Sequence, residues 1–192
     1  MLYKFVKTRI LKKYFLQYKP FLVFLAKFLG SYAVLIFVYN AYLKSFDANK
    51  FEADGFTKMV AAQSGFLLKN AAFDFELGDA KDSPSVVFYV RSKAFVRIVE
   101  GCNALSVMIL FVAFVLAFRG KFWTTVMFLV VGLLTIHVLN ISRIALLTAG
   151  MFYYPEFKTL LHDVVFPLFI YGVVFGLWVL WVNKFSDYAK SF

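Results

Sequence analysis

Residues 101–142 decide the fold: GCNALSVMILFVAFVLAF (101–118), then RGK (119–121), then FWTTVMFLVVGLLTIHVLNIS (122–142). The two long pieces contain no charged residue, and the short turn between them contains Arg119 and Lys121. An uncharged apolar run of this length is typical of a helix that crosses roughly 30 Å of membrane hydrocarbon. Two such runs joined by a short basic turn predict an antiparallel pair of transmembrane helices.

Two further segments have the same character. Segment 20–43 has Lys27 as its only charge, and segment 164–183 has none. The first is too long for the apolar region of a signal peptide and no small-residue cleavage pattern follows it, which indicates an uncleaved anchor. Because 62% of the 192 residues are hydrophobic, a soluble domain is excluded. We predict one all-α integral membrane domain, with transmembrane helices at 20–43, 101–118, 122–150 and 164–183.

The charge distribution predicts the orientation of these helices. The net charge is +10, and residues 1–19 contain six basic residues and no acidic one. Basic residues also occupy the turn at 119–121 and the tail at 184–192. Positively charged segments remain on the cytoplasmic side of a membrane. We therefore expect both termini in the cytoplasm, a location in the inner membrane, and contact with lipid headgroups but not with nucleic acid.

The region 44–100 is neutral, with eight basic and eight acidic residues, and is expected outside the cytoplasm. Within it, residues 54–72 predict an amphipathic helix that lies on the membrane. Its apolar face is expected to contain Phe56, Met59, Val60, Phe66 and Leu67. A turn at 79–84 and the β-branched and aromatic run at 86–99 predict a short β-hairpin.

Three chemically distinctive side chains are expected at one depth. Cys102 begins the second span on its outer side. Arg143 follows Lys121 by 22 residues, which is roughly 33 Å along a helix and reaches the outer boundary of the membrane. His162 precedes the fourth span on the same side. A thiol, a guanidinium and an imidazole from three helices are therefore predicted to meet.

Together these groups suit acyl transfer. A cysteine at a helix N-terminus near an arginine favours the thiolate, while Glu100 opposes it. Arg143, which shares a helix face with Asn140, would stabilise a tetrahedral oxyanion. His162 would protonate a leaving amine and then activate the incoming nucleophile.

Each residue taken alone also has a purely structural explanation. Cys102 would pack as a small apolar side chain, Arg143 would contact lipid headgroups, and His162 with Asp163 would cap a helix. His137, deeper in the third span, is expected to be a packed core histidine. A zinc site lacks the HExxH or CxxC spacing, so we predict no metal and no cofactor. One cysteine excludes an intrachain disulfide.

Two non-enzymatic functions therefore remain as alternatives. One is a membrane adaptor or assembly factor of an export system, in which Cys102 only packs. The other is a small component of lipid or polysaccharide export that holds an anionic headgroup with Arg143.

At these residues the sequence resembles the exosortase/archaeosortase family of membrane transpeptidases. The resemblance rests on Glu100-Gly101-Cys102-Asn103, on Asn140-Ile141-Ser142-Arg143 and on His162, and covers roughly residues 95–183. The short chain and the form of the first motif look most like the small exosortase F-type members of Bacteroidetes.

The resemblance implies a membrane cysteine protease or transpeptidase, with Cys102 as nucleophile, Arg143 as electrostatic partner and His162 as acid and base. Glu100, Asn103, Asn140 and Asp163 are expected to support them. It also implies its partners, which are exported proteins whose C-terminal sorting signal consists of a short motif, a transmembrane helix and a basic tail. Cleavage through a thioester at the outer face would transfer the protein to an unknown acceptor nucleophile. The insertion at 44–100 is expected to form walls or a lid over this site.

Overall fold

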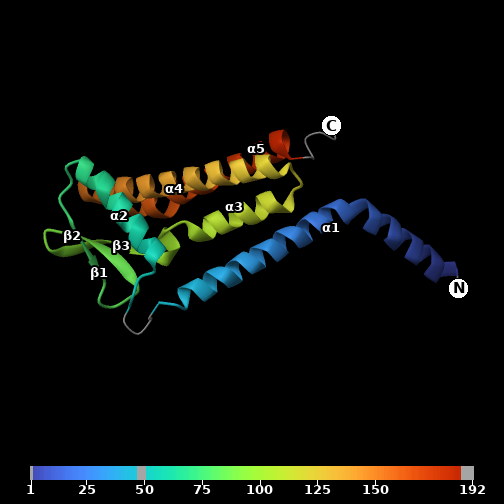
Figure 1. The fold of residues 1–192 in the computed structure, drawn as a ribbon, viewed down its shortest axis with the longest axis horizontal. Coiled ribbons are helices and arrows are strands. Elements are labelled where there is room, and N and C mark those ends of the chain that lie inside the picture. Colours follow the sequence, from blue (N-terminus) through green and yellow to red (C-terminus); the bar gives the residue numbers. More distant parts are fainter. Residues whose placement is uncertain (1, 47–50, 187–192) are drawn as a thin grey trace.

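The computed structural model describes residues 2–46 and 51–186, with side chains from residue 16 onward. Helix α1 (Leu2–Leu43) includes the basic N-terminal segment and contains Pro20, and Figure 1 shows a bend in its N-terminal part. Such a bend is expected because an internal proline removes a helical hydrogen bond. Three described helical stretches are long and apolar enough to span a membrane: Leu16–Leu43, Phe122–Tyr153 and Leu160–Phe185. The prediction of an all-α, multi-pass membrane protein is confirmed.

Helix α3 (Leu105–Ala117) is apolar but shorter than the predicted segment 101–118. At 13 residues it is about 20 Å long, less than the hydrocarbon thickness. Its start is displaced because Glu100–Cys102 form a separate 3-10 turn and Ala104 has a left-handed φ of 64°. The predicted helix start at residue 101 is therefore wrong by four residues.

Helix α4 (Phe122–Tyr153) begins where the sequence predicts and continues past the predicted end at 150. A 3-10 turn at Pro155–Phe157 follows it. Helix α5 (Phe166–Leu180) lies between two π-helical segments, Leu160–Val165 and Trp181–Phe185. These segments extend α5 beyond both ends of the predicted span 164–183.

The helices form a layered bundle in which α3 lies between α1 and the α4–α5 pair (Figure 1). The start of α1 and the α3–α4 turn lie at one end of the molecule (Figure 1). Gly120 in that turn pairs with Ser186, which brings the end of the α5 region there as well. The described basic segments therefore gather at the end opposite the sheet. Residues 187–192 of the predicted basic tail lie outside the described part of the chain.

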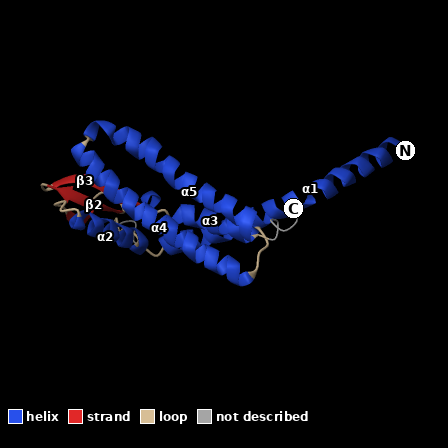
Figure 2. Ribbon diagram, turned by 90° about the horizontal axis from the view of Figure 1, so that it is seen from above, coloured by secondary structure: helices blue, strands red, loops and turns tan. Residues whose placement is uncertain are grey.

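Helix α2 (Gly55–Asn70) and a three-stranded sheet form the other end of the molecule (Figure 2). The antiparallel strands are β1 (Glu76–Asp79), β2 (Ser85–Val90) and β3 (Lys93–Val99), in that order. The predicted hairpin is present as β2–β3, and β1 adds a third strand. The two-residue turn between β2 and β3, Arg91–Ser92, has positive φ at both positions. This conformation suits a hairpin but normally favours Gly, Asn or Asp, which explains why the sequence gives no turn signal there.

The apolar face predicted for α2 is divided in the structure: Val60 is buried against protein, whereas Met59 and Phe66 are exposed, and their contact with a membrane stays a prediction. Residues with mostly small side chains face inward instead: Thr57, Val60, Ala61, Ser64, Gly65 and Leu68. They allow α2 to approach α4 and the sheet closely. A Cβ added at Gly65 would lie only 3.0 Å from Phe75 Cζ. Close packing against protein, and not the number of large apolar residues, selects the buried face.

Two apolar clusters hold the described structure together. The outer cluster joins α2, the sheet and the C-terminal half of α4, and its buried members are Ala53, Val60, Ala61, Leu68, Phe73, Phe75, Val86, Phe88, Val90, Ile98, Ile144 and Ala145. The membrane cluster joins α3, α4 and the α5 region, and its buried members are Ala104, Met108, Phe111, Val115, Ile136, Val174 and Trp181. Residues 100–104 lie at the junction between β3 and α3, where the two clusters meet.

Candidate active site

A cavity of about 260 Å³ lies where the sheet meets the helices, and Cys102, Arg143 and His162 all line it. The remaining lining residues come from β3, α4 and the segment before α5: Phe95, Val96, Arg97, Ile98, Ile144, Leu147, Met151 and Lys158. The structure therefore brings together the three side chains that the sequence predicts to meet. Strand β3 forms one wall, as expected for the insertion, whereas α2 does not line this cavity.

Cys102 ends the 3-10 turn and is half-buried. The fully buried side chain of Asn140 donates a 2.9 Å hydrogen bond from Nδ2 to the backbone carbonyl of Cys102. Because α3 begins only at Leu105, Cys102 does not lie at the N-terminus of that helix. The predicted effect of a helix dipole on this thiol therefore loses its basis, and positive charge near the thiol comes from basic side chains that line the cavity, Arg143 among them.

Asn103, predicted only as a supporting residue, is fully buried behind Cys102. Its Oδ1 accepts a 2.8 Å hydrogen bond from the Leu105 N–H, and its Nδ2 donates a 3.0 Å bond to Thr57 Oγ1. Thr57 in turn donates to Asp54, the N-cap of α2. Sequence reasoning missed Asp54 and Thr57 in this setting. Their spacing gives a helix-capping signal, but nothing local indicates contact with Asn103.

Arg143 comes to the cavity from α4. Its Nε is buried and has no hydrogen-bond partner among the described residues. A buried donor without an acceptor costs free energy, unless a bound molecule supplies the acceptor. Arg143 therefore has unused donor capacity beside Cys102.

Arg97, which also lines the cavity, is already committed to a carboxylate. It donates to Asp82 through both terminal nitrogens, at 2.9 and 3.2 Å, and the hydrogen bond from Arg97 lowers the pKa of that carboxyl group. Lys158 also lines the cavity, and like Arg97 it is a basic residue that the sequence analysis did not identify as part of the site. Glu100 does not line this cavity but a smaller one of about 120 Å³, together with Glu52 and Asp54.

His162 lies in the π-helical segment before α5 and is half-exposed. Its Nδ1 is 2.6 Å from Asp163 Oδ1. With Asp163 ionised, Nδ1 carries a proton and donates it to this hydrogen bond, which leaves Nε2 of the neutral ring as a proton acceptor. Isolated π-helical turns are frequent at functional sites because they redirect side chains.

His137 is separate from this cavity. It lies midway along α4, where its Nε2 is 2.7 Å from Gln63 Oε1 and its ring packs against Phe56. This environment agrees with a packed histidine that links α2 to α4. Among the described residues, no group of three His, Cys, Asp or Glu side chains is arranged to hold a metal ion.

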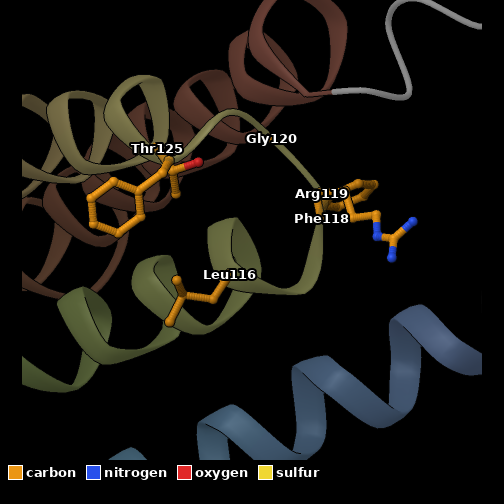
Figure 3. A pocket seen from close by; sticks show the side chains of 6 residues that line it. Leu116, Phe118, Arg119, Gly120 and Thr125 are labelled. Atoms are coloured by element: carbon orange, nitrogen blue, oxygen red, sulfur yellow. The ribbon is translucent and has the colours of Figure 1, made fainter.

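A larger and more open hollow of about 400 Å³ lies at the opposite end of the molecule, beside the α3–α4 turn (Figure 3). Arg119 extends away from the helices there, and Leu116, Gly120 and Thr125 are among the lining residues (Figure 3). Its lining contains neither a thiol nor an imidazole. The chemistry therefore favours the smaller cavity as the active-site candidate.

Comparison with known proteins gives one family. Residues 22–183, more than four fifths of the chain, match the family model for transmembrane exosortases. No curated protein and no solved structure matches the chain.

Proposed function

The chain belongs to the transmembrane exosortase family, and from this premise we propose that it is a membrane-embedded cysteine transpeptidase that cleaves C-terminal sorting signals of exported proteins. Family membership supports a transpeptidase-type sorting function in the membrane. The observation that carries the finer proposal is that Cys102, Arg143 and His162 line one cavity although they come from three separate elements.

In the proposed first step, His162 Nε2 takes the proton of the Cys102 thiol, and Sγ attacks the carbonyl carbon of the scissile peptide bond. A carbon–sulfur bond forms and negative charge develops on the carbonyl oxygen. Arg143, which has a buried Nε without a partner among the described residues, is suited to stabilise that charge. The carbon–nitrogen bond then breaks, and His162 gives a proton to the departing amine of the anchor peptide.

In the proposed second step, His162 removes a proton from the acceptor nucleophile, which attacks the thioester. The carbon–sulfur bond breaks, His162 passes the proton it took from the acceptor to Cys102 Sγ, which regenerates the thiol, and the exported protein is joined to the acceptor. The 2.6 Å contact between His162 Nδ1 and Asp163 supports this function of His162, since it leaves Nε2 available for both proton transfers.

The proposal puts the cavity at the outer face of the cytoplasmic membrane. Its support is that the basic segments described above lie at the opposite end of the molecule and that positive charge remains on the cytoplasmic side. The substrate is an exported protein with a short motif, a transmembrane helix and a basic tail. Such an anchor reaches the cavity from within the bilayer, with its scissile bond at the depth of Cys102.

The test uses co-expression with a candidate anchored substrate and intact-mass analysis of that substrate. Loss of its C-terminal tail is expected with the wild-type protein and is expected to disappear in Cys102→Ala, Arg143→Gln and His162→Gln. Cys102→Ser is expected to be severely impaired, because a hydroxyl is a poorer nucleophile near neutral pH. His137→Gln and Arg119→Gln change the same residue types outside the cavity, and should retain processing.

The outcomes separate the alternatives. Processing that persists in Cys102→Ala would contradict the cysteine mechanism and favour a non-enzymatic adaptor. A defect in Arg143→Gln with normal behaviour of Cys102→Ala would favour the binding of an anionic headgroup. Processing that requires all three residues supports the transpeptidase, and the mass of the new C-terminus identifies the acceptor.

A further inference from the structure

The segment that presents Cys102 has little regular structure of its own. Glu100–Cys102 is a single 3-10 turn, and Ala104 has a left-handed φ of 64°. A 3.2 Å hydrogen bond from the Asn103 N–H to the Glu100 carbonyl closes the end of this turn. Neither strand pairing nor a continuous helix therefore fixes Cys102, and side chains must supply the constraint.

Asn103 provides the first part of this constraint. The Leu105 N–H can only donate, so the 2.8 Å contact requires Oδ1 of Asn103 on that side. Nδ2 consequently points to Thr57 Oγ1, 3.0 Å away. The buried side chain of Asn103 thus accepts a hydrogen bond from the first backbone N–H of α3 and donates one to α2.

The direction of each remaining hydrogen bond then follows. Because Thr57 Oγ1 accepts from Asn103, its single proton is available to Asp54 Oδ2 at 2.5 Å. Asp54 Oδ1 accepts a second bond, 3.0 Å long, from the Thr57 N–H. Asp54, Thr57 and Asn103 are all at least nine-tenths buried. Only a carboxylate at 54 and a hydroxyl at 57 satisfy every donor in this chain.

From the other side, α4 holds the same turn through the bond from Asn140 Nδ2 to the Cys102 carbonyl. The nucleophile's turn is thus fixed between two asparagines, one on α4 and one connected to the N-terminus of α2. Asp54, Thr57 and Asn103 have no buried side-chain atom without a partner, whereas Asn140 Oδ1 has no partner among the described residues. Removal of one member of the Asp54–Thr57–Asn103 chain therefore leaves its neighbours unpaired.

We infer that Asp54, Thr57 and Asn103 form a positioning relay that holds Cys102 in the cavity. None of these three residues lines the cavity, so they act through the turn and not on the substrate. Helix α2 is thereby a working part of the site although it forms none of its walls. The importance of this positioning for turnover rests on the proposed function of Cys102, but the positioning itself is testable without a substrate.

The test uses the full chain in lipid nanodiscs and the rate at which a polyethylene-glycol maleimide, too large for the cavity, labels Cys102. Since the chain contains one cysteine, labelling reports this turn alone, and Cys102→Ser gives the zero level. Thr57→Val, which replaces the hydroxyl by a methyl group, is expected to raise the labelling rate about tenfold, because a buried group is left unsatisfied and local opening becomes easier. Asp54→Asn is expected to act in the same direction without a change in size.

Two variants act as matched controls. Thr57→Ser keeps the hydroxyl and should restore the wild-type rate. Thr148→Val removes another fully buried hydroxyl, whose 2.8 Å bond goes only to Ile144 in its own helix, and should leave the rate unchanged. If Thr57→Val and Thr148→Val label equally, or if Asp54→Asn behaves as wild type, the relay is overturned. If Thr57→Val does not fold, the labelling rate of Asp54→Asn tests the relay instead.

A second measurement separates this inference from the proposed function. With a processed substrate, Thr57→Val should lower kcat and leave KM unchanged, because Thr57 does not contact the cavity. If the wild-type protein processes nothing while the labelling result holds, the proposed function fails and the relay stands. Normal labelling of Thr57→Val together with normal turnover would overturn the relay alone.

Discussion

The outer cluster draws twelve buried side chains from a helix, a sheet and the end of α4, whereas the membrane cluster has only seven buried side chains from three helical elements. On the helices that form the membrane cluster, much of the apolar surface faces outward, as with Leu168 and Phe175 of α5. The outer region, meaning α2, the sheet and the C-terminal half of α4, removes the apolar side chains of the outer cluster from water, so the hydrophobic effect stabilises it. Lipid tails are as apolar as leucine, so the membrane region depends on the fit between helices. The two regions should therefore respond differently to the same kind of substitution.

The largest effect is expected from loss of volume in the outer cluster. Phe88 is fully buried and its ring packs edge-on against Phe75 at 5.0 Å. Phe88→Ala should destabilise the outer region by about 3–5 kcal/mol, because it leaves a cavity. Limited proteolysis of the reconstituted protein measures this as faster cleavage within the outer region. Phe66→Ala makes the same change at an exposed position of α2 and should have no such effect. If Phe88→Ala and Phe66→Ala were cleaved equally fast, burial in the outer cluster would not be what stabilises this region.

The next effect tests fit within the membrane cluster. A Cβ at Gly132 of α4 would overlap the ring of Phe111 on α3. Gly132→Val should lower the thermal midpoint in detergent, with an overpacking cost of about 1–3 kcal/mol. Gly172→Val on α5 is the matched control, because nothing lies within 4 Å of its added Cβ. If Gly132→Val melts like Gly172→Val, close packing of α3 on α4 is not what holds this region.

A smaller and more local effect is expected where the two regions meet. Asn140→Leu keeps a side chain of similar size but leaves the Cys102 carbonyl without its donor. The cost should be about 1–3 kcal/mol, concentrated in residues 100–105. Hydrogen–deuterium exchange should therefore speed up in that turn and not in the strands. Asn183→Leu, at an exposed position, is the control. Uniform acceleration throughout the outer region would show instead that Asn140 stabilises the whole outer cluster.

The smallest effect is expected at the surface of the sheet. Asp82 is exposed, and Arg97 lowers its pKa below the ordinary value of 3.8. The contribution of ionised Asp82 to stability is therefore complete above pH 3.8 and is lost as the pH falls through the lower, folded-state pKa. Asp82→Asn should reduce the thermal midpoint only slightly at neutral pH, since exposed ion pairs contribute little. The difference from wild type should vanish in strong acid, and a difference that grows on acidification would contradict this assignment.

Much of the molecule was predictable because the information is local. Hydropathy and charge along 101–142 predict apolar helices around a basic turn, and α4 begins at Phe122 as expected. The β-branched and aromatic run at 86–99 predicts the hairpin. The family was also recognisable from short motifs around Cys102, Arg143 and His162, and the match over residues 22–183 confirms it. Assignment to the exosortase F-type group stays a prediction.

A shared depth of Cys102, Arg143 and His162 is predicted by the sequence because a helix rises by a fixed distance per residue. Their common cavity also depends on β3, which supplies the wall at Phe95–Ile98. The buried face of α2 was not predictable from its large apolar residues, because close contact with α4 and the sheet selects its small ones. The break at Ala104 was equally hidden, since a left-handed alanine has no signature in composition.

The sequence by itself determined the membrane class, the apolar segments and the family, and it predicted that Cys102, Arg143 and His162 meet. The tertiary structure decided how Cys102 is held. The hydrogen bond from Asn103 to Thr57 joins residues 46 positions apart, and the bond from Asn140 to Cys102 joins residues 38 positions apart. No periodicity or spacing rule predicts such pairs, because their free energy depends on burial that exists only after the sheet, α2 and α4 have packed together.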